Sequence, residues 1–187
     1  MTKKYFHFLL VLFLLLLPGL LQSQNNNSVY NISIPALSGE QVIKLSDYSG
    51  KKILIVNVAR LSDRANQLKD LNELARLAGE DSLVIIICPS NSFDHEQGNQ
   101  NEVRNYYAGI TGPGIKITVP VTVTGNEKHA LYNWLGSKIL NGVMSGRVIN
   151  DFNKFLISEN GTLIGFFGKE INPVDPLMLR VLKLDNN

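Results

Sequence analysis

The stretch I-L-I-V-N-V-A at residues 53–59 decides the fold class of this 187-residue chain. Its nearly continuous apolar character is typical of a central strand that is covered on both faces. A second apolar run, L-V-I-I-I-C at residues 83–88, follows it. Residues 67–78, between the two runs, are predicted to form a helix, because they carry an apolar stripe with helical spacing formed by Leu68, Leu71, Leu74, Ala75 and Ala78. Two buried strands with a helix between them predict an α/β domain.

Further elements are predicted outward from this unit. Apolar periodicity and turn signals predict strands at residues 29–34, 42–45 and 119–123, helices ending near residue 108 and covering residues 129–135 and 176–184, and a hairpin of residues 152–158 and 162–167. We therefore expect a central mixed sheet with helices on both faces. In such sheets, functional residues lie at the carboxyl ends of the strands, which are here residues 59–63 and 89–97.

The N-terminus has the pattern of a secretory signal peptide. Lys3 and Lys4 precede an apolar run at residues 8–17, and Ser23 offers a small residue near the end of the segment. The run is shorter than the roughly 20 residues that span a bilayer as a helix. The sequence therefore predicts a cleaved signal peptide at residues 1–23 and export to a periplasm or the outside of the cell, with an uncleaved membrane anchor as the alternative.

The remaining chain consists of a polar tether at residues 24–28 and one domain at residues 29–187. Removing Lys3 and Lys4 with the signal peptide reduces the 18 basic residues to 16, equal to the 16 acidic residues. A neutral domain of this kind is not expected to bind nucleic acid. The single cysteine excludes an internal disulfide, a cysteine-rich zinc site and a redox cycle that needs two thiols in one chain. No cofactor, no metal site and no membrane span after cleavage are predicted.

Four blocks resemble the glutathione peroxidase family. L-S-D-Y-S-G-K at residues 45–51, together with I-L-I-V-N-V-A, is similar to the family's L-x-x-Y-x-G-K and L-I-V-N-V-A-S-x-C-G. The other blocks are C-P-S-N-S-F at residues 88–93, V-x-G-x-x-x-H-x-L-Y-x-x-L at residues 123–135 and D-F-N-K-F-L-I at residues 151–157. The resemblance covers residues 29–184 and implies a thioredoxin-like fold. The short stretch between the second and third blocks resembles the compact members of the family, which implies a monomer.

The resemblance also locates the family's catalytic positions. Its nucleophile falls on Ser62, its glutamine on Ser92, and its tryptophan and asparagine on Asn150 and Asp151. A serine hydroxyl is a weak nucleophile without a positioned base and has no reversible state equivalent to a sulfenate. The sequence therefore predicts a non-catalytic, pseudo-peroxidase member of a peroxide-reducing family. We expect its pocket to bind a small polar ligand or a thiol or peptide partner.

Two enzymatic alternatives remain open at this point. A weak thiol-dependent peroxidase would use Cys88, and an exposed Cys88 with a lowered pKa would favour it, whereas a buried Cys88 would favour the binding protein. A serine hydrolase would pair Ser62 or Ser92 with His95 and an aspartate, and it depends on whether His95 reaches either hydroxyl. The neighbouring Asp94-His95-Glu96 is not a closed set of metal ligands. His129 is expected to form a hydrogen bond at the start of a helix.

Overall fold

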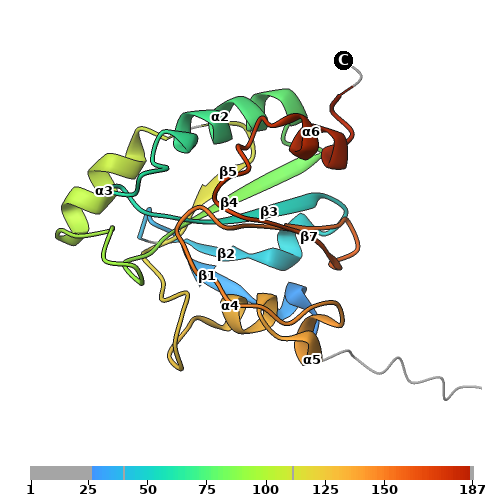
Figure 1. Cartoon of the computed structure of the whole chain (residues 1–187), viewed down its shortest axis with the longest axis horizontal. Helices are drawn as coiled ribbons and strands as arrows, with labels where there is room; N and C mark the ends of the chain where they lie inside the picture. Colours follow the sequence, from blue (N-terminus) through green and yellow to red (C-terminus); the bar gives the residue numbers. More distant parts are fainter. Residues whose placement is uncertain (1–26, 40, 111, 186–187) are drawn as a thin grey trace, which may run out of the picture.

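Five strands form the central sheet, in the order β5-β4-β3-β6-β7 (Figure 1). The computed structural model describes residues 27–39, 41–110 and 112–185. The strands of the sheet are β3 (Lys52–Val58), β4 (Leu83–Pro89), β5 (Ile115–Ile117), β6 (Lys154–Ile157) and β7 (Leu163–Phe167). The first three run parallel to one another, whereas β6 is antiparallel to β3 and β7 is antiparallel to β6. The predicted mixed sheet is confirmed.

Helices and a second, two-stranded sheet cover the two faces of the central sheet. The helices are α2 (Gln67–Ala78), α3 (Gln100–Ala108), α4 (Ala130–Leu135), α5 (Lys138–Asn141) and α6 (Pro176–Leu182). The small sheet pairs β1 (Ser33–Pro35) with β2 (Val42–Lys44). Figure 1 shows α2 and α6 above the central sheet and α4 with the small sheet below it. This arrangement confirms the prediction of helices on both faces.

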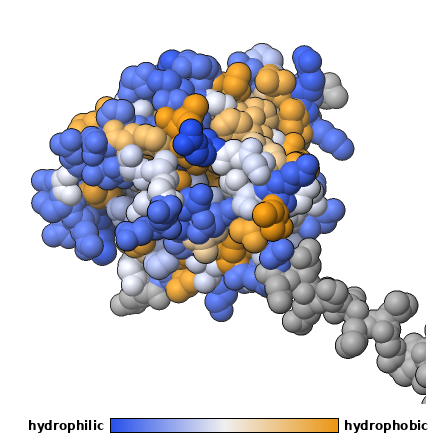
Figure 2. All heavy atoms as spheres, turned by 60° about the horizontal axis from the view of Figure 1, so that its bottom comes forward, coloured by the Kyte–Doolittle hydropathy of each residue, from blue (hydrophilic) through white to orange (hydrophobic). Residues whose placement is uncertain are grey.

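The alternation of side chains along β3 explains the two layers. Leu54 and Val56 belong to one apolar cluster with residues of α2, α3 and α6, while Ile53 and Ile55 belong to the other, with residues of α4 and the small sheet. Because successive side chains of a strand point to opposite faces, an apolar strand is buried only between two layers. On the face that Figure 2 shows, polar side chains dominate and apolar ones form separate small groups.

Two of the predicted strands differ from the structure. Residues 29–34 begin as a 3-10 helix at Val29–Asn31, because the Ser28 side chain accepts a hydrogen bond from the Tyr30 amide and thereby caps it. Residues 119–123 form no regular strand, and β5 lies instead at Ile115–Ile117. Pro120 lacks an amide hydrogen, and a proline in this position cannot continue a ladder. The helix α5 was not predicted.

The predicted signal peptide at residues 1–23 and the first part of the tether lie outside the described residues. In the part of the chain that is described, none of the helices has the length and apolar character needed to cross a bilayer.

Candidate functional site

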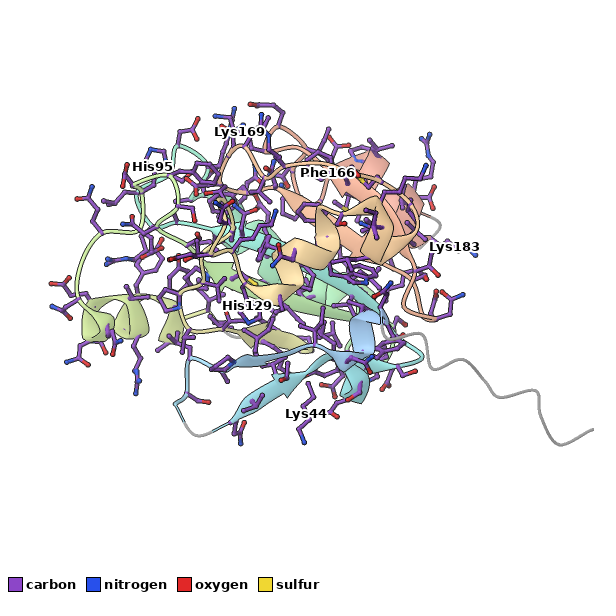
Figure 3. The ribbon with its side chains drawn as sticks, turned by 90° about the horizontal axis from the view of Figure 1, so that it is seen from below. Lys44, His95, His129, Phe166, Lys169 and Lys183 are labelled. Carbon is purple, nitrogen blue, oxygen red and sulfur yellow. The ribbon has the colours of Figure 1, made fainter. Side chains whose placement is uncertain are left out.

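Four loops contribute to a cavity of about 290 Å³ at the carboxyl end of β3. The loop after β3, the loop after β4, the segment before β6 and the loop after β7 provide its lining, which consists of Ser62, Asp63, Phe93, Asp94, His95, Asn150, Asp151 and Lys169. Figure 3 shows His95 and Lys169 at the same edge of the molecule, opposite Lys44. The structure thus brings three of the four predicted site residues into one cavity, namely Ser62, Asn150 and Asp151.

A histidine–aspartate pair occupies this cavity. The Nδ1 atom of His95 lies 2.5 Å from Oδ2 of Asp151. The Asp151 side chain is only 3% exposed, whereas that of His95 is 51% exposed. The second carboxylate oxygen of Asp151, Oδ1, is buried and has no hydrogen-bond partner among the described residues. A carboxylate on Nδ1 fixes the orientation of an imidazole ring and leaves Nε2 as the nitrogen that can accept a proton.

Ser62 has other neighbours. Its hydroxyl accepts a hydrogen bond from the Arg64 amide at 3.3 Å and lies 3.5 Å from Oδ1 of Asp63. Asp63 also pairs with Lys169 at 3.2 Å, and this hydrogen bond lowers the pKa of Asp63. The described residues show no hydrogen bond between Ser62 and His95. The hydroxyl therefore lines the same cavity as the histidine–aspartate pair, and its carboxylate contact is with Asp63.

Ser92 lies outside the cavity. Its hydroxyl accepts hydrogen bonds from the Val123 amide and from the Ser90 hydroxyl, both at 3.0 Å. These bonds fix the loop after β4 against the segment that leads to α4. The position that the resemblance equates with the family's glutamine therefore supports a loop in this chain, and His95 lines the cavity instead.

A side chain of the neighbouring strand β3 holds the backbone of the segment that contains Asn150 and Asp151. The Asn57 side chain on β3 donates a hydrogen bond to the Asn150 carbonyl at 2.9 Å. Phe152 follows with a positive φ of 57°, which turns the chain sharply into β6 and buries the Phe152 ring completely. Lys154 is also fully buried and donates to the Phe152 carbonyl at 2.8 Å; burial lowers its pKa to about 8.

Cys88 lies inside the domain, on β4. Its side chain has no exposed surface, and its Sγ donates a hydrogen bond to the Ile86 carbonyl at 4.0 Å. Burial raises the pKa of the thiol to about 11, although Tyr132 and Thr118 act in the opposite direction. A thiol of this kind stays protonated near neutral pH and is a poor nucleophile.

Sequence reasoning missed the cluster that brings the two main loops together. The buried carboxylate of Glu96 lies 2.5 Å from Nε of Arg60 and accepts a hydrogen bond from the Arg60 amide at 2.9 Å. The Tyr107 hydroxyl donates to the same carboxylate at 2.5 Å, and burial, followed by this hydrogen bond, raises the pKa of Tyr107. A further bond joins the Leu61 amide to the His95 carbonyl at 2.9 Å. These contacts place Ser62 and His95 in the same cavity.

The only sequence signal for this cluster was an acidic residue within a polar loop, which does not reveal its partners. In the sequence, Glu96 stands out only as the last residue of Asp94-His95-Glu96. Among the described residues, no group of three or more potential ligands could hold a metal ion. The hydrogen bond predicted for His129 at the start of a helix is confirmed, because its Nδ1 accepts from the Leu131 amide at the start of α4.

Comparison with known proteins agrees with the fold and with the sequence blocks. Residues 29–136 match the family model described as glutathione peroxidase. A glutathione peroxidase of Lactococcus lactis subsp. cremoris is 31% identical over 146 residues, which cover 77% of this chain and 91% of the relative. The crystal structure of Trgpx in its apo form is 25% identical, with a TM-score of 0.62, and the match covers 83% of this chain and 95% of that one.

A more distant structure shows the fold alone. The thioredoxin-family thiol:disulfide interchange protein of Chlorobium tepidum is 16% identical, with a TM-score of 0.56, over 81% of this chain and 92% of its own. The fold is therefore thioredoxin-like, as the resemblance implied. The family-model match over residues 29–136 and the 31% identity with the Lactococcus lactis relative show that the chain belongs to the glutathione peroxidase family, whose members reduce peroxides.

Proposed function

We propose that this protein is a member of the family that lacks peroxidase activity and acts as a binding protein. Peroxide reduction in the family needs a thiolate or an equivalent nucleophile, which attacks the O–O bond and is oxidised to a sulfenate. Ser62 offers a hydroxyl where the resemblance places that nucleophile. The observation that carries the proposal is the complete burial of Cys88, the one thiol of the chain, with its raised pKa.

The cavity beside Ser62 is the proposed binding site. Its volume of about 290 Å³ is at the lower end of the range for ligand pockets, which favours a small ligand or a single side chain of a peptide. Its lining is mostly polar and includes Asn150 and the carboxylate of Asp151. A small polar ligand, or a polar side chain of a partner peptide, therefore matches its size and chemistry.

Export is the second part of the proposal. It rests on the charged start and the short apolar run that precede the tether. The N-terminal residue of the protein purified from its native compartment, identified by mass spectrometry, tests whether the signal peptide is cleaved. A chain that begins near residue 24 would support export with cleavage, and an intact Met1 in a membrane fraction would favour the uncleaved anchor.

Peroxide consumption tests the loss of activity. We expect the purified protein and a Cys88→Ala variant to consume no hydrogen peroxide in the presence of excess dithiol. Turnover that disappears in the variant would overturn the proposal and make Cys88 a displaced nucleophile. For the binding site, a ligand whose affinity falls in Asp151→Ala without a matching loss of stability would support the cavity, while equal affinity would contradict it.

A serine hydrolase is the second candidate, and one observation favours it. Ser62, His95 and Asp151 line one cavity, and the carboxylate meets His95 on Nδ1, as in a Ser-His-Asp triad. Against it stands the absence of a hydrogen bond between Ser62 and His95 in the described residues. Hydrolysis of p-nitrophenyl acetate, compared between wild type, Ser62→Ala and His95→Ala, distinguishes the two. Burst release of nitrophenol that is lost in both variants would establish the hydrolase.

A further inference from the structure

A second and larger cavity of about 820 Å³ lies at the other edge of the central sheet. Its lining residues belong to three parts of the chain, which are β5, α3 with the turn after it, and the β1–β2 sheet with the segments beside it. It shares no lining residue with the cavity beside Ser62. Its volume falls within the range of pockets that hold drug-sized ligands.

The floor of this cavity is apolar. Side chains from all three walls form it, including Leu37, Ile43, Ile110, Ile115 and Ile117. Tyr107 also lines it, but the Tyr107 hydroxyl donates to Glu96 and is not available to a ligand. The polar chemistry of the cavity must therefore come from its charged side chains.

Those charged side chains are mainly positive. Lys44, Arg104 and Lys116 line the cavity, and Asp47 is the one carboxylate among the lining residues that the structure describes. None of the three cations takes part in an ion pair or a side-chain hydrogen bond with another described residue. By contrast, Lys169, which lines the cavity beside Ser62, pairs with Asp63, and Arg60 pairs with Glu96.

We infer that this cavity binds an amphipathic organic anion, with its apolar body along β5 and its carboxylate, sulfonate or phosphate head on Arg104 and Lys116. Among the described residues, three cations without an ion-pair partner and one carboxylate give the cavity an excess of positive charge that an anionic head complements. The apolar floor supplies the hydrophobic part of the binding free energy. Neither feature depends on the family's catalytic positions.

Displacement of a fluorescent anion tests this inference. The purified protein is titrated with 8-anilinonaphthalene-1-sulfonate, and the bound dye is then competed with dodecanoate, 1-dodecanol or dodecylammonium, each below its micellar concentration. We expect dodecanoate to compete at a concentration about tenfold lower than 1-dodecanol, and dodecylammonium to be the weakest. Equal potency of dodecanoate and 1-dodecanol would overturn the anionic part of the inference.

Variants locate the site. The double variant Arg104→Gln/Lys116→Gln should lower the affinity for dodecanoate about tenfold, because each exposed cation contributes a fraction of a tenfold change in affinity. It should leave the affinity for 1-dodecanol unchanged. The matched control, Lys69→Gln with Lys138→Gln, removes two exposed lysines elsewhere and should change neither. Ala108→Trp should fill the cavity and weaken both ligands. Unchanged affinity in the Arg104 and Lys116 variant would contradict the site, whereas Asp151→Ala should have no effect on this ligand in either case.

Discussion

Ser62 and Cys88 each lack a different one of the two properties that define an accessible thiolate, namely the sulfur atom and its accessibility. Ser62 lies on a loop at the carboxyl end of β3, beside charged groups and a half-exposed histidine, but its atom is a hydroxyl oxygen. Cys88 offers a sulfur atom, but it lies on β4 with no exposed surface and a pKa raised to about 11. Peroxide reduction needs an accessible thiolate, so the right environment and the right atom must coincide at one residue.

The largest expected effect comes from removing the carboxylate that holds the loop of Ser62 to the loop of His95. Glu96→Ala leaves the guanidinium of Arg60 and the Tyr107 hydroxyl without their buried partner. We expect the free energy of unfolding to fall by about 3 kcal/mol, measured by urea denaturation. The control is Glu73→Ala, which removes an exposed partner of Arg76 and should produce no resolvable change. Equal effects of the two substitutions would contradict the role given to Glu96.

Moving the sulfur to Ser62, which lines the cavity and is 9% exposed, separates the effect of the atom from the effect of its environment. In Ser62→Cys, the new thiol should react with 5,5′-dithiobis(2-nitrobenzoate) at least about a hundredfold faster than Cys88 in the native protein, because Cys88 must wait for local opening of the fold. The amplitude of the fast phase in absorbance should correspond to one thiol per chain. Comparable rates for the two thiols would mean that Cys88 is accessible, and would favour the hypothesis that Cys88 is the nucleophile of a thiol-dependent peroxidase. Ser92→Cys places a thiol outside the cavity, and its reaction rate serves as the comparison for Ser62→Cys.

The environment of Cys88 also predicts a pH dependence. Its pKa is about 11 in the folded state and 9.0 for an ordinary cysteine, so between these values the folded protein keeps a proton that the unfolded chain has lost. Stability must therefore fall as the pH rises through this window. Relative to Cys88→Ala, the free energy of unfolding of the wild type should decrease by roughly 1 kcal/mol between pH 8 and pH 10. A pH-independent difference between the two proteins would contradict the raised pKa.

The smallest effect is expected at the rim of the Ser62 cavity. Lys169→Gln removes the partner of Asp63, whose side chain is exposed, and exposed ion pairs contribute little to stability. The thermal unfolding midpoint should remain within experimental error of the wild type. The pKa of Asp63, followed by NMR titration, should nevertheless rise toward its ordinary value, because the Lys169 hydrogen bond is the main cause of its lowering. An unchanged pKa would mean that Lys169 does not contact Asp63 in solution.

Much of the fold could be predicted from the sequence, because it depends on local patterns. The apolar run of β3 and the leucine stripe of α2 each carry their own signal, and α2 begins and ends at the predicted residues. The composition alone establishes that the chain has a single cysteine, and therefore that no two-thiol cycle can take place within it. Local signals failed where a neighbouring group overrode them, as the Ser28 side chain did at the start of the domain.

The tertiary structure alone decided the composition of the candidate site. His95 and Asp151 are 56 residues apart, and nothing in either segment indicates that they meet. Their contact depends on the Glu96 cluster, which sets the loop after β4, and on the positive φ of Phe152, which turns the chain into β6. A separate contact, the hydrogen bond from the Val123 amide, holds the Ser92 hydroxyl outside the cavity. Periodicity records which side chains are buried, whereas the partners of a loop residue are fixed by packing between segments distant in sequence.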